Sequence, residues 1–225
     1  MFYTIPTKKG KGVELWGSYD DLRTLHHVIG KFWNNETLTG KPSFENRDSL
    51  ISSFSYEIRK AFEGHREKRV HGHYSLEPLP HFGTHLSWVH VLFSVAALRS
   101  NMRFIDVDKL DVALFLQLEY WLEHSMEAFD ETGAKALKPY VNGALYLDNP
   151  YMYQFMRSIN MDYFLFGGGK RAFRQLPSLL KAGVFFTEEY NNLLAHFTKE
   201  AKRLNCNVED LEIDDDHIEY DTIKW

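Results

Sequence analysis

The sequence has one cysteine, Cys206, in 225 residues, so it cannot form an internal disulfide. Low cysteine use suits a reducing compartment, and we therefore expect a cytoplasmic protein. The sequence also lacks any run of 18 or more apolar residues, and its N-terminus lacks a basic segment followed by a long apolar run. We expect neither a membrane-spanning helix nor a signal peptide.

A basic surplus is absent as well. The net charge is −5, and residues 209–221 hold eight of the 31 acidic residues without any Lys or Arg. Residues 1–208 carry 25 basic and 23 acidic residues, a net charge of +2. Nucleic-acid-binding proteins neutralise phosphates with clustered positive charge, so we expect no nucleic-acid partner. The acidic segment is either a solvated run or a contact surface for a basic partner.

The sequence contains no complete catalytic or cofactor motif. It has no GxSxG nucleophile elbow, and Cys206 has no electropositive neighbour that would make it reactive. The run Gly167-Gly-Gly-Lys170 lacks the spacings of a phosphate-binding loop and indicates the end of a helix followed by a turn. These absences argue against the common nucleophilic and nucleotide-dependent enzymes.

Apolar residues recur at helical spacing through most of the chain, with capping residues before several segments. The clearest helices are expected at about 19–33, 84–101, 107–130 and 187–204. The segment from Thr84 is apolar on most sides, which is typical of a buried helix. Residues 131–147 are predicted to be irregular, and residues 65–83 to be a histidine-rich linker.

Short β-prone runs occur near both ends of the chain. Residues 2–5 and 13–16 flank a Gly-containing loop and predict a hairpin, and residues 218–223 predict a strand that joins it. We therefore expect a mainly α or α+β fold, with about six helices and a small antiparallel sheet built from the N-terminal hairpin and the C-terminal strand. The chain is expected to be a single domain over 1–225, with a hairpin at 1–17, a helical body at 18–204 and an acidic tail and strand at 205–225.

Three sequence segments carry a resemblance to a known family. They are Val13-Glu-Leu-Trp-Gly-Ser-Tyr-Asp-Asp-Leu22, Tyr56-Glu-Ile-Arg-Lys-Ala61, and Trp88 leading to Leu98-Arg99. Together they resemble an uncharacterised bacterial protein family, a domain of unknown function, over the first half of the chain. The resemblance implies a bacterial cytoplasmic protein and no particular activity.

Histidine is the one residue type with a marked concentration. Six of the eleven histidines lie between residues 65 and 90, where an even distribution would place about one. They are His65, His71, His73, His81, His85 and His90. Imidazole is the commonest metal ligand and the usual proton shuttle near neutral pH, so any readable chemical site is expected here.

Within this cluster, His71, His73, Glu77 and His85 supply enough nitrogen and oxygen donors for zinc or iron. The spacing of His71, His73 and Glu77 is close to the first metal motif of cupins. The second half of that motif is absent, and cupins are β-barrels whereas this chain has helical periodicity. The competing interpretation is a solvated linker, with His90 hydrogen-bonded inside the helix that follows.

The sequence favours a non-enzymatic bacterial cytoplasmic protein that binds another protein. This prediction rests on the acidic segment, the many aromatic residues and the missing catalytic motifs. The alternative is a metal-dependent enzyme that uses the histidines at 65–90. The sequence does not indicate the oligomeric state.

Overall fold

The computed structural model describes residues 1–40, 43–71, 79–213, 218 and 222–225, and within them the fold is mainly helical with one small sheet. The helices are α1 Tyr19–Gly30, α2 Phe44–Phe62, α3 Trp88–Asn101, α4 Lys109–Phe129, α5 Glu131–Val141, α6 Met152–Leu165, α7 Gly169–Leu180 and α8 Glu188–Leu204. The strands are β1 Tyr3–Pro6, β2 Gly12–Gly17, β3 Glu67–His71 and β4 Leu79–Ser87, all antiparallel in the order β1-β2-β4-β3. The mainly helical fold class with a small antiparallel sheet is confirmed.

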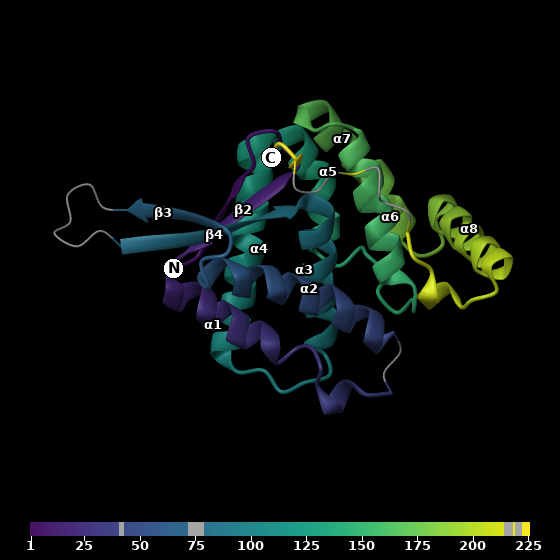
Figure 1. Cartoon of the computed structure of the whole chain (residues 1–225), viewed down its shortest axis with the longest axis horizontal. Coiled ribbons are helices and arrows are strands. Elements are labelled where there is room, and N and C mark those ends of the chain that lie inside the picture. The colour runs from purple at the N-terminus through teal and green to yellow at the C-terminus, as the bar shows by residue number, and fades with distance from the viewer. Residues whose placement is uncertain (41–42, 72–78, 214–217, 219–221) are drawn as a thin grey trace.

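The helix α3 is the centre of the hydrophobic core, around which other helices pack (Figure 1). Its apolar side chains point in all directions, so it has no solvent-facing stripe and is buried along most of its length. Trp88 in its first turn is fully buried, and its Nε1 donates to the carbonyl of Gly10 at 3.2 Å. This contact ties the core helix to the β1–β2 loop.

Local capping signals in the sequence correctly marked several helix starts. Ser18 caps α1 and forms a reciprocal capping box with Asp21. Asp108 caps α4, and Thr187 caps α8. The three consecutive glycines, Gly167–Gly169, all have positive φ and join α6 to α7, as expected for a helix end and turn.

The described residues form eight α-helices instead of about six, and α5 is the clearest one that the sequence did not predict. Gly133 and Pro139 within α5 are poor helix formers, which favoured an irregular segment. Tertiary contacts compensate for this preference. Gly133 lies against the Phe173 ring, where a Cβ atom would come within 2.5 Å, and Asp130 caps α5 while forming an ion pair with Arg174 of α7.

The sheet differs most from the prediction. The N-terminal hairpin is confirmed as β1–β2, but residues 67–71 and 79–87, expected as a linker and the start of a helix, form β3 and β4. The helix predicted from Thr84 begins at Trp88, where Ser87 is the cap. In the predicted C-terminal strand, the described residues 218, 222 and 223 belong to no strand, and 219–221 lie outside the described residues.

The two faces of the sheet have different environments. Val13, Leu15 and Leu86 point to the same face and are buried in the hydrophobic core. Glu14 and His85 are cross-strand partners on the opposite face, where most side chains are only partly buried. The β3–β4 hairpin projects beyond the helical body on the side of α1 and α2 (Figure 1).

Candidate functional site

The structure places only one of the four predicted metal ligands with its side chain described. His85 lies on β4, near the helical body. His71 is the last residue of β3, and its side chain is not among those described. His73 and Glu77 lie outside the described residues.

The strand register separates His71 from His85. His71 pairs with Leu79, and His85 lies six residues further along β4. At about 3.3 Å per residue, their backbones are about 20 Å apart. A metal bound by imidazole lies only about 2.1 Å from each nitrogen, so the sheet does not bring these two histidines to one metal ion. Among the side chains that the structure describes, no group of three His, Cys, Asp or Glu is arranged to hold a metal.

His85 lies between two carboxylates from neighbouring strands. Its Nε2 is 3.8 Å from Glu14 Oε1 on β2, and its Nδ1 is 4.0 Å from Glu67 Oε1 on β3. The ring of Trp225 stacks on the imidazole with centroids 5.1 Å apart and planes inclined by 10°. Trp225 also makes an edge contact with Phe164 of α6 at 5.9 Å.

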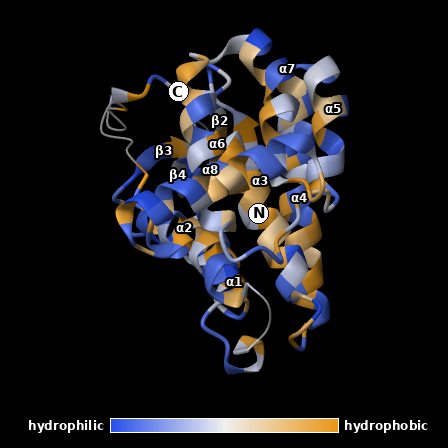
Figure 2. Ribbon diagram, turned by 90° about the vertical axis from the view of Figure 1, so that its right-hand side faces the viewer, coloured by the Kyte–Doolittle hydropathy of each residue, from blue (hydrophilic) through white to orange (hydrophobic). Residues whose placement is uncertain are grey.

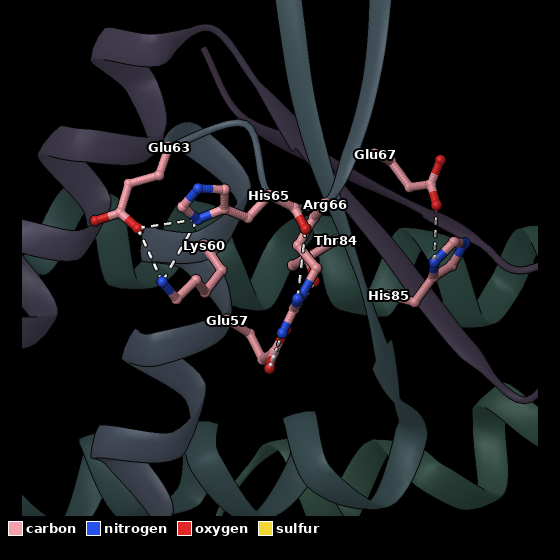
Figure 3. A network of polar contacts seen from close by, with 8 residues as sticks. All are labelled: Glu57, Lys60, Glu63, His65, Arg66, Glu67, Thr84 and His85. Carbon is pink, nitrogen blue, oxygen red and sulfur yellow. Dashed lines mark hydrogen bonds and ion pairs between the residues drawn. The ribbon is translucent and has the colours of Figure 1, made fainter. Parts of the chain in front are cut away.

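A second polar cluster joins α2 to the start of β3, as Figure 3 shows. Arg66 donates from Nε and from one terminal nitrogen to Glu57, at 2.8 and 3.0 Å, so the pair is bidentate. Thr84 of β4 donates to the same carboxylate at 3.2 Å. The hydrogen bonds to Glu57 raise the pKa of Arg66. Glu57 therefore connects the helix, the hairpin and the inner face of the sheet.

His65 and His90, the first and last of the six clustered histidines, lie beside or within helices. His65 follows the end of α2, where its Nδ1 lies 3.4 Å from Glu63 Oε2 and from Lys60 Nζ (Figure 3). His90 lies in the first turn of α3, and its Nε2 is within 2.9 Å of Ser53 Oγ. This hydrogen bond joins α3 to α2, so it does not lie within one helix. Burial lowers the pKa of His90 to about 4, partly offset by the Glu57 charge.

A cleft of about 900 Å³ runs between these groups, and we call it the edge cleft. Thr84, His85, Leu86 and Ser87 all line it, although consecutive strand residues point to opposite faces of a sheet. A cavity that contacts both faces must follow the edge of the strand. The opposite wall comes from α2 and α6, with Ser53, Tyr56, Glu57, Tyr153, Met156, Arg157, Asn160 and Phe164. The remaining lining residues are Arg66, Glu67, His90, Ile223 and Trp225.

The edge of β4 is open in the cleft because β3 is too short to cover it. The first residue of β3, Glu67, pairs with Gly83, so residues 84–87 of β4 pair with β2 alone among the described strands. Ser87 at the end of this edge donates to Asn160 of α6 at 2.5 Å.

Sequence reasoning found His85 and missed the cleft around it. Arg66 and Glu57, nine positions apart, connect the end of a helix to the entry of a strand. The signal that could have revealed this strand is the alternation of side chains between its two faces, with Phe82, Thr84 and Leu86 buried on one face. This alternation predicts a strand if the following helix begins at Trp88.

The whole chain matches one protein family. Residues 2–225 match the model of a family described as "Domain of unknown function (DUF6904)". The chain belongs to that family. The resemblance to an uncharacterised family is thus confirmed, and it extends beyond the first half of the chain. No curated protein and no solved structure matches the sequence. None of the described helices is long and apolar enough to cross a membrane.

Proposed function

We propose that this protein binds a partner protein, and that an extended segment of the partner lies in the edge cleft beside β4. The observation that carries the proposal is the open edge of β4 at Thr84–Ser87, which among the described residues pairs with a strand on one side only. Open strand edges bind extended peptides through backbone hydrogen bonds, and pockets beside the edge select the side chains. The cleft of about 900 Å³ along this edge provides room for such a segment.

The C-terminal residues show what kind of side chain suits the cleft. Trp225 packs between His85 and Phe164, and residues 223–225 are neither helical nor in a strand. Glu14 and Glu67 lie within 4.0 Å of His85, so the surroundings of this aromatic position are acidic. Lys224 precedes Trp225 in the chain. We therefore expect the partner segment to contain a basic residue next to an aromatic one.

A peptide with the sequence of residues 218–225, Ile-Glu-Tyr-Asp-Thr-Ile-Lys-Trp, tests this site. We expect the full-length Trp225→Ala variant to bind the labelled peptide, measured by fluorescence anisotropy. Replacing the peptide's tryptophan with alanine should weaken binding at least about tenfold, since a buried aromatic side chain contributes about 1.5–3 kcal/mol. Wild-type protein should bind more weakly than the variant, because its own Trp225 competes at high effective concentration.

The matched control is Phe186→Ala, which removes an exposed aromatic residue outside the cleft and should bind like wild type. Hydrogen exchange should slow at residues 84–87 when the peptide binds. The proposal is wrong if the Trp225→Ala variant does not bind the peptide, or if it binds the tryptophan and alanine peptides equally.

The alternative function, a metal-dependent enzyme that uses zinc or iron at the histidines of residues 65–90, remains a separate proposal with its own test. Elemental analysis of untagged protein measures bound metal directly. Because His71 and His85 are far apart on the hairpin, the His71→Ala/His73→Ala variant and the His85→Ala variant should be analysed separately. Near-stoichiometric metal that is lost in the first variant would favour the enzyme over the protein-binding function.

We further propose a bacterial cytoplasmic location, which the single cysteine suits.

A further inference from the structure

The outer face of α4 carries a straight row of exposed apolar side chains. Val112, Leu116 and Tyr120 are spaced four residues apart, and they are 36%, 56% and 59% exposed. Side chains at this spacing lie one above the other on a helix. The opposite face of α4 holds Phe115, Leu118 and Leu122 in the core, so this row is additional to the packing of the fold. Hydrophobic segments of α4 lie at the periphery of the molecule in Figure 2.

Opposite charges lie at the two ends of the row. Lys109 is seven residues before Leu116, and Glu123 is seven residues after it, on the same side of the helix. Lys109 is exposed and Glu123 is partly exposed. Within the described part of the chain, neither forms an ion pair with another side chain.

This arrangement is symmetric about Leu116 and complementary to itself. When two α4 helices pack antiparallel around a twofold axis at Leu116, each Val112 meets Tyr120 of the second copy. The same register places each Lys109 opposite Glu123 of the second copy, which forms two ion pairs. Parallel packing in register would instead bring Lys109 against Lys109 and Glu123 against Glu123, so the charges select the antiparallel arrangement.

We infer that α4 is the interface of a homodimer, and that the partner is a second copy of this chain packed antiparallel across a twofold axis at Leu116. A twofold interface uses the same surface on both copies, which is what a self-complementary row provides. The edge cleft is lined by residues of α2, β3, β4, α3, α6 and the C-terminus, together with Arg66, and by no residue of α4, so both surfaces can be used together.

Sedimentation velocity of the full-length protein over a concentration series tests the dimer. The wild type should sediment as a species of twice the 26.4 kDa chain mass and dissociate on dilution. Lys109→Glu and Glu123→Lys alone should each weaken dimerisation about 30-fold, because each change turns two attractive pairs into two repulsive ones. The Lys109→Glu/Glu123→Lys variant should recover dimerisation, since it restores both pairs with reversed signs.

Circular dichroism keeps the single variants interpretable, because exposed charge reversals should leave the helix content unchanged. Leu116→Asp should give a folded monomer, while Leu165→Asp, at an exposed leucine of α6 outside the row, should remain a dimer. A wild-type monomer at all concentrations would overturn the inference and assign the row to a different protein partner. A double variant as weak as the single variants would overturn the antiparallel arrangement.

Discussion

Replacing Arg47 with alanine is expected to lower the free energy of unfolding by about 3–5 kcal/mol, the largest effect that we predict for a single side chain. The Arg47 side chain is completely buried, and it joins three parts of the fold. Its Nε donates to Asn101 Oδ1 at the end of α3 at 2.7 Å, and one terminal nitrogen donates to the Leu147 carbonyl at 3.2 Å and to Asp148 at 2.9 Å.

The expected loss comes mainly from the acceptors that remain. Asn101 is fully buried, so its oxygen would lack a donor in the alanine variant, and the missing side chain would leave a cavity. Asp148 is 52% exposed and can be solvated when Arg47 is removed. Asp148→Asn, which keeps an oxygen acceptor for Arg47 and removes only the negative charge, is the matched control and should cost less than Arg47→Ala. Urea unfolding at neutral pH measures both values, and equal losses would show that the exposed ion pair dominates.

Acidification from pH 6.5 to pH 4 is expected to lower the free energy of unfolding by up to about 3 kcal/mol through His90 alone. Burial lowers the pKa of His90 from 6.5 to about 4. Between these values the unfolded chain binds a proton that the folded protein does not bind, so acid favours the unfolded state. Above pH 6.5 and below pH 4 this contribution should not change.

His90→Gln removes the titrating group and retains a side chain that can form a hydrogen bond with Ser53. The free energy of unfolding of this variant should fall less steeply from pH 6.5 to pH 4 than that of wild type. His26 also has a lowered pKa and contributes in the same direction, so the difference between variant and wild type is the relevant quantity. His27→Gln, at an exposed position of α1, is the control and should retain the wild-type slope. Parallel curves for His90→Gln and wild type would contradict the burial of His90.

Local sequence signals predicted the helices better than the sheet. Ser18, Asp108 and Thr187 cap helices by contacts within four residues, so their effect can be predicted from neighbouring positions alone. The strands β3 and β4 depend on pairing with each other and with β2, which is about 70 positions away along the chain. The run Thr84–Ser87 fits a helix start as well as a strand, and only the register with β2 decides between them.

The side chains of Arg47 and of the edge cleft likewise could not be placed from the sequence, because their contacts join distant segments. The sequence before Arg47 is polar and contains Gly40 and Pro42, which favours an exposed loop. In the structure the Arg47 guanidinium is nevertheless fully buried. Glu57 and Arg66 are nine positions apart, and only the turn after α2 brings them into bidentate contact. The sequence singled out His85 as a candidate metal ligand, but it did not predict the cleft that surrounds this residue.

The sequence by itself determined the helical class, the N-terminal hairpin and the main helix caps, because periodicity and capping act over a few residues. Only the tertiary structure decided that the histidine-rich segment enters a sheet, that β3 leaves the edge of β4 open, and that Arg47 lies in the core. Those features depend on contacts between distant segments, whose free energy of burial and pairing exceeds the weak local preferences of the residues involved.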